Sequence, residues 1–221
     1  MAKSKEFNLD ALQALQELTL GTNHVERWQG TPQLLPYNVS THAYNCAMLY
    51  MQLCCICAKP IDLQLLSALL CHDNMESLTG DLLAPAKDAS PEFWDSIEEK
   101  VQEQWQTDTN MSVPLVKTFL PIEDDLQRLS VETQHLLKII DMLEFLLHAQ
   151  KEYKAGNRCS KVMDGLKYGG ASLKCRLNAA QNEFDDDDDP ENAYILDIVT
   201  CIRYYYNRQC SALSLTDEYY V

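Results

Sequence analysis

Helical periodicity runs through most of this sequence and constrains its fold more than any other feature. Apolar residues recur at intervals of three and four positions, which is the spacing of one face of an α-helix. No segment shows a convincing strand alternation. The periodicity predicts helices over residues 9–20, 40–58, 62–78, 91–105, 131–155, 163–181 and 190–207. With 221 residues and 46% hydrophobic content, the chain can bury one sizeable core, so we predict a single all-α helical bundle.

The charge of the chain restricts its partners. The formal net charge is −15, and no cluster of lysine and arginine offers the basic face that a nucleic-acid polymer requires. The negative net charge does not exclude a small anionic substrate, because a bound metal ion and a few cationic side chains can make the electrostatic potential of one pocket positive. No apolar run reaches the roughly 18 residues of a membrane span, and the amphipathic start differs from a secretory signal. We therefore expect no membrane partner and a cytoplasmic location.

Nine cysteines occur in the chain, and they show no paired spacing. Several of them, including Cys46, Cys71 and Cys201, stand among apolar residues, so we expect reduced thiols in a reducing compartment. The cluster at Cys54, Cys55 and Cys57 does not favour a metal site, because helical neighbours one and two positions apart point in different directions.

A histidine and an aspartate end an apolar helix in "LLCHDNMESLTGD", residues 69–81. A buried carboxylate without a partner costs several kcal/mol, so Asp73 needs a cation, a metal ion or several hydrogen-bond donors. His42, in the first turn of another apolar helix, and Asp141, on an otherwise apolar face, are also polar where apolar residues are expected. Two imidazoles and two carboxylates suit an open hydrolytic metal centre. The alternative for each residue is a hydrogen-bonded polar group of the core.

Five separated motifs resemble one family in order and spacing. They are "RW" at residues 27–28, "NVSTH" at 38–42, "HDNMESLTGD" at 72–81, "PAK" at 85–87 and "KIIDML" at 138–143. Together they resemble the HD-domain phosphohydrolases, most closely the bacterial 5'-deoxynucleotidase branch, with related small phage enzymes that act on dATP. The similarity covers residues 27–157. Thr41 and Ala43 depart from the usual pattern beside His42, so the contacts that orient this histidine would differ from those of the family. Asn74 and Met75 are larger than the resemblance leads us to expect, which leaves the substrate range open.

The resemblance implies a metal centre. One divalent ion (Co, Mn, Zn, Mg or Fe) would be held by His42, His72, Asp73 and Asp141. Glu76 would be the catalytic carboxyl group that handles the proton of the attacking water or of the leaving group.

The resemblance also implies four substrate-binding residues. Arg27 and Lys87 would bind the phosphate. Asp81 would accept a hydrogen bond from the sugar 3'-hydroxyl, and Trp28 would fill the space beside C2' that a ribose needs for its 2'-hydroxyl.

The implied reaction is metal-dependent hydrolysis of a 2'-deoxynucleoside 5'-monophosphate to deoxynucleoside and phosphate. A dATP-type triphosphohydrolase that releases triphosphate is the alternative within the enzyme class, and a catalytically silent nucleotide-binding bundle is the alternative outside it. We expect one HD domain over residues 1–221, with its motif-bearing core at 27–157 and a helical C-terminal extension that contains the acidic loop 185–189. The family further implies a homo-oligomer, at least a dimer, in the cytoplasm, or in the host cytoplasm for a phage-encoded protein.

Overall fold

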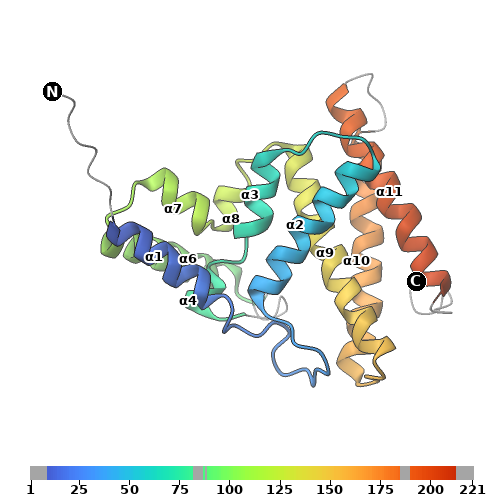
Figure 1. Ribbon diagram of the computed structural model, residues 1–221, viewed down its shortest axis with the longest axis horizontal. Coiled ribbons are helices and arrows are strands. Elements are labelled where there is room, and N and C mark those ends of the chain that lie inside the picture. Colours follow the sequence, from blue (N-terminus) through green and yellow to red (C-terminus); the bar gives the residue numbers. More distant parts are fainter. Residues whose placement is uncertain (1–8, 82–86, 88, 185–189, 213–221) are drawn as a thin grey trace. The chain divides into compact units, whose positions relative to one another are not determined.

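The structure is a computed structural model that describes residues 9–81, 87, 89–184 and 190–212 (Figure 1). Over these ranges the regular elements are helices, and one isolated antiparallel bridge joins Glu26 and Asn38. The predicted all-α fold is therefore confirmed. The described chain forms two compact units. The first comprises the described parts of Met1–Gln29, Tyr37–Thr41 and Cys71–Leu126, and the second comprises those of Gly30–Pro36, His42–Leu70 and Gln127–Val221.

The first unit contains five helices among its described residues. They are α1 (Leu9–Gly21), α4 (Glu76–Thr79), α6 (Pro91–Thr109), α7 (Val113–Phe119) and α8 (Glu123–Leu126). Helix α1 packs against α4 and α6. Two apolar clusters fill the space, one around Val116 and the other around Leu18 and Leu120, and Trp105 packs against both. This packing supports the turn that precedes α4.

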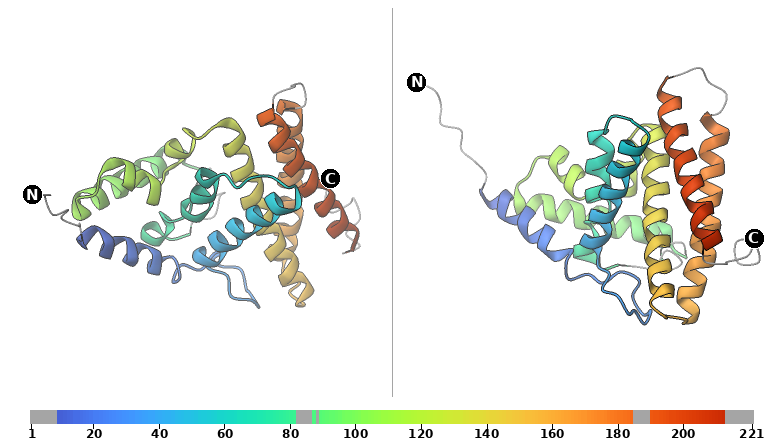
Figure 2. Two further views of the ribbon diagram at one scale, coloured as in Figure 1. Left: turned by 45° about the horizontal axis from the view of Figure 1, so that its top comes forward. Right: turned by 45° about the vertical axis from the view of Figure 1, so that its right-hand side comes forward.

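The second unit is built on three long helices, α9 (Val131–Lys154), α10 (Ser160–Phe184) and α11 (Pro190–Ala212). They run side by side, and α10 packs along both α9 and α11 (Figure 2). Gly169 permits the close approach of α9 and α10, because a Cβ at this position would lie only 3.2 Å from Phe145 Cε1. Ser130 caps α9 by accepting a hydrogen bond from the Thr133 N–H.

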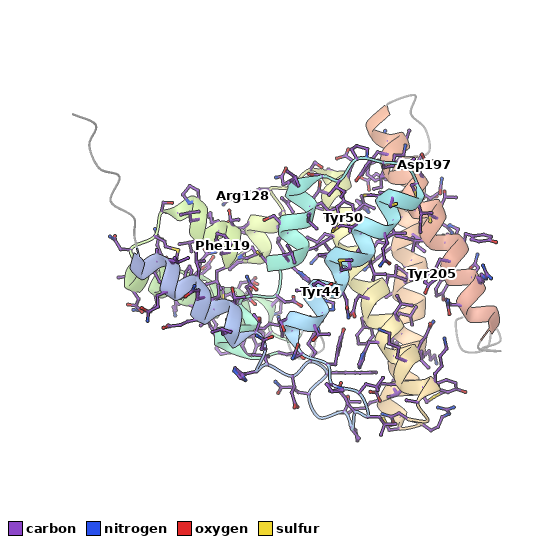
Figure 3. All side chains as sticks on the ribbon, in the orientation of Figure 1. Tyr44, Tyr50, Phe119, Arg128, Asp197 and Tyr205 are labelled. Carbon is purple, nitrogen blue, oxygen red and sulfur yellow. The ribbon has the colours of Figure 1, made fainter. Side chains whose placement is uncertain are left out.

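Two further helices, α2 (Val39–Ile56) and α3 (Leu63–Cys71), precede these three in the chain. The end of α2 is tied to α11 by a 2.6 Å hydrogen bond between the hydroxyls of Tyr50 and Tyr194, and by a 2.7 Å ion pair between Lys59 and Asp197 (Tyr50 and Asp197 are labelled in Figure 3). These contacts fix α2 against the C-terminal helices of the second unit.

The loop of residues 30–36 is held by Glu152 of α9. The Glu152 carboxylate accepts hydrogen bonds from the N–H groups of Leu34 and Leu35 and from the Asn157 side chain. Lys161 adds a hydrogen bond to the carbonyl of Gly30. The fully buried Glu152 carboxylate therefore supplies acceptors for backbone N–H groups of this loop, which has no regular secondary structure.

The prediction of one continuous helix over residues 62–78 was wrong, because a turn interrupts it. Helix α3 ends at Cys71, residues 72–75 form a turn, and α4 begins at Glu76. Tight hydrogen bonds from the N–H groups of Asn74 and Glu76 to the carbonyls three residues earlier replace the α-helical ones. The Asn74 side chain also donates to the carbonyl of Phe119 (labelled in Figure 3), at 2.8 Å. Helices α7 and α8 were not expected from the sequence.

The acidic run 185–189 lies outside the described residues, as does the proposed motif residue Pro85. Among the described helices, none combines the length and the hydropathy that crossing a bilayer would demand.

Candidate metal centre and substrate residues

A short antiparallel connection positions the first two predicted substrate residues. The Arg27 N–H donates to the Tyr37 carbonyl at 3.0 Å, and the Val39 N–H donates to the Val25 carbonyl at 3.0 Å. Trp28 follows with a φ of +62°, a left-handed conformation that is unusual for a bulky residue. Its N–H donates to Asp81 Oδ2 at 2.8 Å, so Asp81 helps to hold the strained residue in place.

Arg27, His72 and Asp73 come together in the first unit. The Arg27 guanidinium contacts Asp73 Oδ2, and His72 Nε2 lies 3.4 Å from the same oxygen. Of the three kinds of partner predicted for Asp73, a cation is present as Arg27. The predicted role of Arg27 at a phosphate group stays a prediction.

Glu76 lies one turn beyond Asp73 and is buried, with 6% of its surface exposed. Burial raises the pKa of its carboxyl group to about 9, helped by the negative charges of Asp73 and Asp81 and opposed by Arg27 and Lys87. Lys87 Nζ lies 3.9 Å from Glu76 Oε1 and 3.8 Å from Glu98 Oε1. The protonated form of Glu76 is thus favoured at neutral pH, as a general acid requires.

His42 and Asp141 come together in the second unit. Asn38 caps α2 by accepting the Thr41 N–H at 2.8 Å, which places His42 in the first turn of the helix. The His42 side chain is fully buried, and its Nε2 lies 3.1 Å from Asp141 Oδ1 on α9. On the other side of the ring, Nδ1 lies 2.7 Å from Glu144 Oε2.

These donor pairs fit a divalent ion. Nitrogen and oxygen ligands at about 2.0–2.2 Å from one ion, at tetrahedral or right angles, are about 2.8–3.6 Å apart. The His42–Asp141 and His72–Asp73 pairs, at 3.1 Å and 3.4 Å, have this spacing. Neutral imidazole with carboxylate is also a common donor set for first-row metals. Each unit therefore supplies one histidine–aspartate pair suited to metal binding.

The sequence analysis did not predict two residues that contact His42, namely Cys46 and Glu144. Cys46 lies one helical turn after His42, and its Sγ is 3.6 Å from His42 Nε2, so His42, Cys46 and Asp141 form a cluster of metal-binding types. Burial raises the pKa of the Cys46 thiol to about 11, so the neutral thiol is favoured over the thiolate at neutral pH. Glu144 shares a helix face with Asp141, three residues before it, but no sequence signal connects it with His42, which is 102 positions away.

The chain matches the family described as 5'-deoxynucleotidase YfbR-like over residues 14–164, more than half of its length. No curated protein matches the chain. Among solved structures, the cyanophage S-2L HD phosphohydrolase DatZ, bound to dA and one catalytic Zn²⁺ ion, is similar at 18% sequence identity with a TM-score of 0.57, covering 88% of this chain and 95% of its own.

An HD-domain phosphohydrolase from Listeria innocua is similar at 15% identity with a TM-score of 0.59, covering 91% of this chain and 98% of its own. Both likenesses concern the fold, which is the helical HD-domain bundle that the motifs predicted. The match over residues 14–164 identifies the family, and the chain belongs to the 5'-deoxynucleotidase YfbR-like proteins.

Proposed function

We propose that this protein hydrolyses the 5'-phosphate ester of 2'-deoxynucleoside monophosphates and releases deoxynucleoside and phosphate. One observation carries the proposal: the family match spans every residue to which the motifs assign a role, from Arg27 to Asp141. The dA and the catalytic zinc ion bound by the cyanophage enzyme support a deoxynucleoside ligand and a divalent metal.

In this proposal, one divalent ion is bound by His42, His72, Asp73 and Asp141. The support is the spacing of the two histidine–aspartate pairs within their own units and the family match. Such an ion supplies a Lewis acid that polarises a phosphoryl oxygen and makes water a better nucleophile. Arg27 exchanges its contact with Asp73 for the phosphate, which its planar guanidinium can bind with two parallel hydrogen bonds.

Glu76 completes the reaction as a general acid. When water attacks phosphorus, the bond from phosphorus to the 5'-oxygen breaks, and the departing oxygen needs a proton. Burial raises the pKa of Glu76 in the metal-free protein, which favours a proton on its carboxyl group before the reaction, and the proton lost by the attacking water restores the acid afterwards. Lys87, close to Glu76, contributes a positive charge for the phosphate.

Trp28 and Asp81 select the sugar. Asp81 Oδ1 accepts the 3'-hydroxyl, while Oδ2 accepts the Trp28 N–H. The Trp28 indole occupies the space beside C2' and excludes ribose by steric repulsion.

The direct test is product analysis with dAMP, dATP, AMP and ATP as substrates, in protein reconstituted with one divalent metal at a time. Release of deoxyadenosine and phosphate from dAMP supports the proposal. Triphosphate released from dATP, with dAMP untouched, would replace it with the triphosphohydrolase. Binding of dAMP without turnover under every metal would indicate a silent nucleotide-binding protein.

Asp73→Ala is the matched inactive variant, expected to lose metal and activity together. Asp197→Asn on α11, where an exposed carboxylate pairs with Lys59, is the control that should retain both. Full metal occupancy in Asp73→Ala would remove Asp73 from the ligand set.

A further inference from the structure

Glu144 is a buried carboxylate that none of the sequence motifs includes. Only 2% of its surface is exposed, and an ionised carboxylate at this depth requires hydrogen-bond donors. Its two oxygens have different partners on α2: Oε2 lies 2.7 Å from His42 Nδ1, and Oε1 accepts a hydrogen bond from Asn45 Nδ2 at 2.8 Å. One carboxylate of α9 therefore contacts two residues of α2 that are three positions apart.

The His42 ring lies between two carboxylates of one helix. Asp141 and Glu144 are three residues apart on α9 and so share a face. Asp141 faces Nε2 at 3.1 Å, and Glu144 faces Nδ1 at 2.7 Å. Both carboxylates only accept hydrogen bonds when ionised, and the contact at Nδ1 is the shorter of the two, which favours a ring proton on Nδ1. Nε2 then faces Asp141, with Cys46 Sγ 3.6 Å away.

Two acceptors that face each other at 3.1 Å repel unless a positive charge lies beside them. A second proton on Nε2 removes the repulsion between Nε2 and Asp141 Oδ1, and so does a cation that both atoms bind. A metal ion must displace that second proton, but it leaves the Nδ1 proton in place. With Nδ1 protonated, Nε2 is the ring nitrogen that would bind an ion.

We propose that Glu144 is a positioning residue of the metal centre: it holds His42 as the Nδ1–H tautomer with Nε2 directed toward Asp141, and Asn45 holds Glu144 in turn. This inference rests on the ligand role of His42 in the proposed function. A carboxylate on the far nitrogen of a metal-binding histidine orients the ring and increases its basicity, and loss of such a partner typically weakens metal binding by about 10–100-fold.

The test measures metal affinity rather than catalysis. Zinc or manganese is titrated into metal-free wild type, Glu144→Gln, Glu144→Asp and Asn45→Ala in competition with a chromophoric chelator. We expect about 10–100-fold weaker binding in Glu144→Gln, a smaller loss in Asn45→Ala, and partial recovery in Glu144→Asp. Glu152→Gln is the matched control, because it removes a buried carboxylate from the same helix that contacts the loop of residues 30–36 instead of His42.

A second measurement reads the tautomer directly. Side-chain ¹⁵N chemical shifts of the metal-free protein, recorded as the pH is raised until the His42 ring carries a single proton, report which nitrogen keeps that proton. We expect the Nδ1–H form in wild type and in the Glu152→Gln control, and an increased Nε2–H population in Glu144→Gln. A purely structural role for Glu144 would leave this population unchanged.

The inference is overturned if Glu144→Gln binds metal within twofold of wild type, if Glu152→Gln weakens binding equally, or if wild-type His42 carries its proton on Nε2. If Glu144→Gln does not fold, Glu144→Asp and Asn45→Ala decide by the same two measurements. Neither measurement requires turnover. An inactive wild type that binds metal would therefore refute the proposed function while leaving the role of Glu144 intact.

Discussion

Glu76 combines deep burial with a neighbouring lysine, and it sits beside two further carboxylates that raise its pKa. Glu76→Gln keeps the shape of the side chain but has no proton to give. We expect turnover of the deoxynucleotide to fall about 10²–10⁴-fold, the usual range for a lost general acid, with metal content unchanged. The measurements are kcat with dAMP and elemental analysis of the purified variant.

Glu98→Gln is the control for this substitution, since Glu98 also lies beside Lys87 but has no assigned role. It should retain turnover within a few-fold of wild type. Near-normal turnover in Glu76→Gln would move the acid to another group.

Trp28 and Asp81 are joined by a hydrogen bond, so their substitutions should produce overlapping defects. Trp28→Ala opens the space beside C2' and should raise kcat/KM for AMP relative to dAMP. Asp81→Ala should cost about 1–3 kcal/mol in kcat/KM for dAMP, because the 3'-hydroxyl loses its acceptor. It should also admit AMP in part, because the strained Trp28 loses the bond to its N–H.

Asp81→Asn keeps an acceptor oxygen for the Trp28 N–H and should therefore retain more of the discrimination than Asp81→Ala. The readout is the ratio of kcat/KM for dAMP to that for AMP in wild type and all three variants. Equal use of both sugars by the wild type would contradict the assigned role of Trp28.

Residues within motifs could be assigned roles from the sequence, while their partners outside the motifs could not. His42 and Asp141 were singled out because each is polar on an apolar helix. Glu144 lies on the same apolar face as Asp141, but its partner His42 is 102 positions away in the chain. Only the packing of α2 against α9 shows that its carboxylate meets the imidazole, and periodicity within one helix does not reveal which helices pack together.

At the level of elements, the long helices were predictable and the irregular segments were not. The apolar stripes of α9 and α10 mark these helices, and the structure extends or shortens them by only a few residues. The end of α3 at Cys71 was missed because the apolar spacing continues into Met75, which packs in the core beside Leu18. The hydrogen bond from Asn74 to Phe119 stabilises the turn through a residue 45 positions away.

The loop of residues 30–36 depends on Glu152. Glu152→Gln removes a charged acceptor from two backbone N–H groups and an asparagine, so we expect a loss of about 1–3 kcal/mol in the free energy of unfolding. Chemical denaturation at neutral pH measures this loss. Glu183→Gln is the control, because Glu183 forms an exposed pair with His135 and its loss should cost less than about 1 kcal/mol.

The Glu152 carboxyl group should also make the stability of the protein depend on pH in the acid range. Burial alone would raise the pKa of Glu152, but the hydrogen bonds from Leu34, Asn157 and Leu35 outweigh it and hold the pKa below its ordinary value. A carboxyl group with a lowered folded-state pKa stabilises the protein above the unfolded-state value of ~4.3 and loses that contribution as pH falls through the folded-state pKa. Wild-type stability should therefore fall more steeply below about pH 4 than that of Glu152→Gln. Parallel curves for the two proteins would contradict the assignment.

For the molecule as a whole, metal binding and folding should be linked. An ion that binds the native state alone stabilises it by about 2.7 kcal/mol when its free concentration is 100 times Kd. For a chain of this size, each kcal/mol shifts Tm by about 2–4 °C, so metal at that concentration should raise Tm by about 5–10 °C, and a chelator should reverse the shift. Thermal unfolding of metal-free protein with and without added ion measures it.

The variants in this experiment test whether the two histidine–aspartate pairs bind the same ion. Asp73 belongs to the first unit and Asp141 to the second. If both carboxylates bind one ion, Asp73→Ala and Asp141→Ala should each abolish most of the metal-dependent rise in Tm, because either substitution removes one ligand and one negative charge from the same set. Asp197→Asn should keep the full rise. Retention of the rise in one of the two ligand variants would show instead that the remaining pair binds the ion by itself, and the four-ligand centre would be replaced by a two-residue site in a single unit.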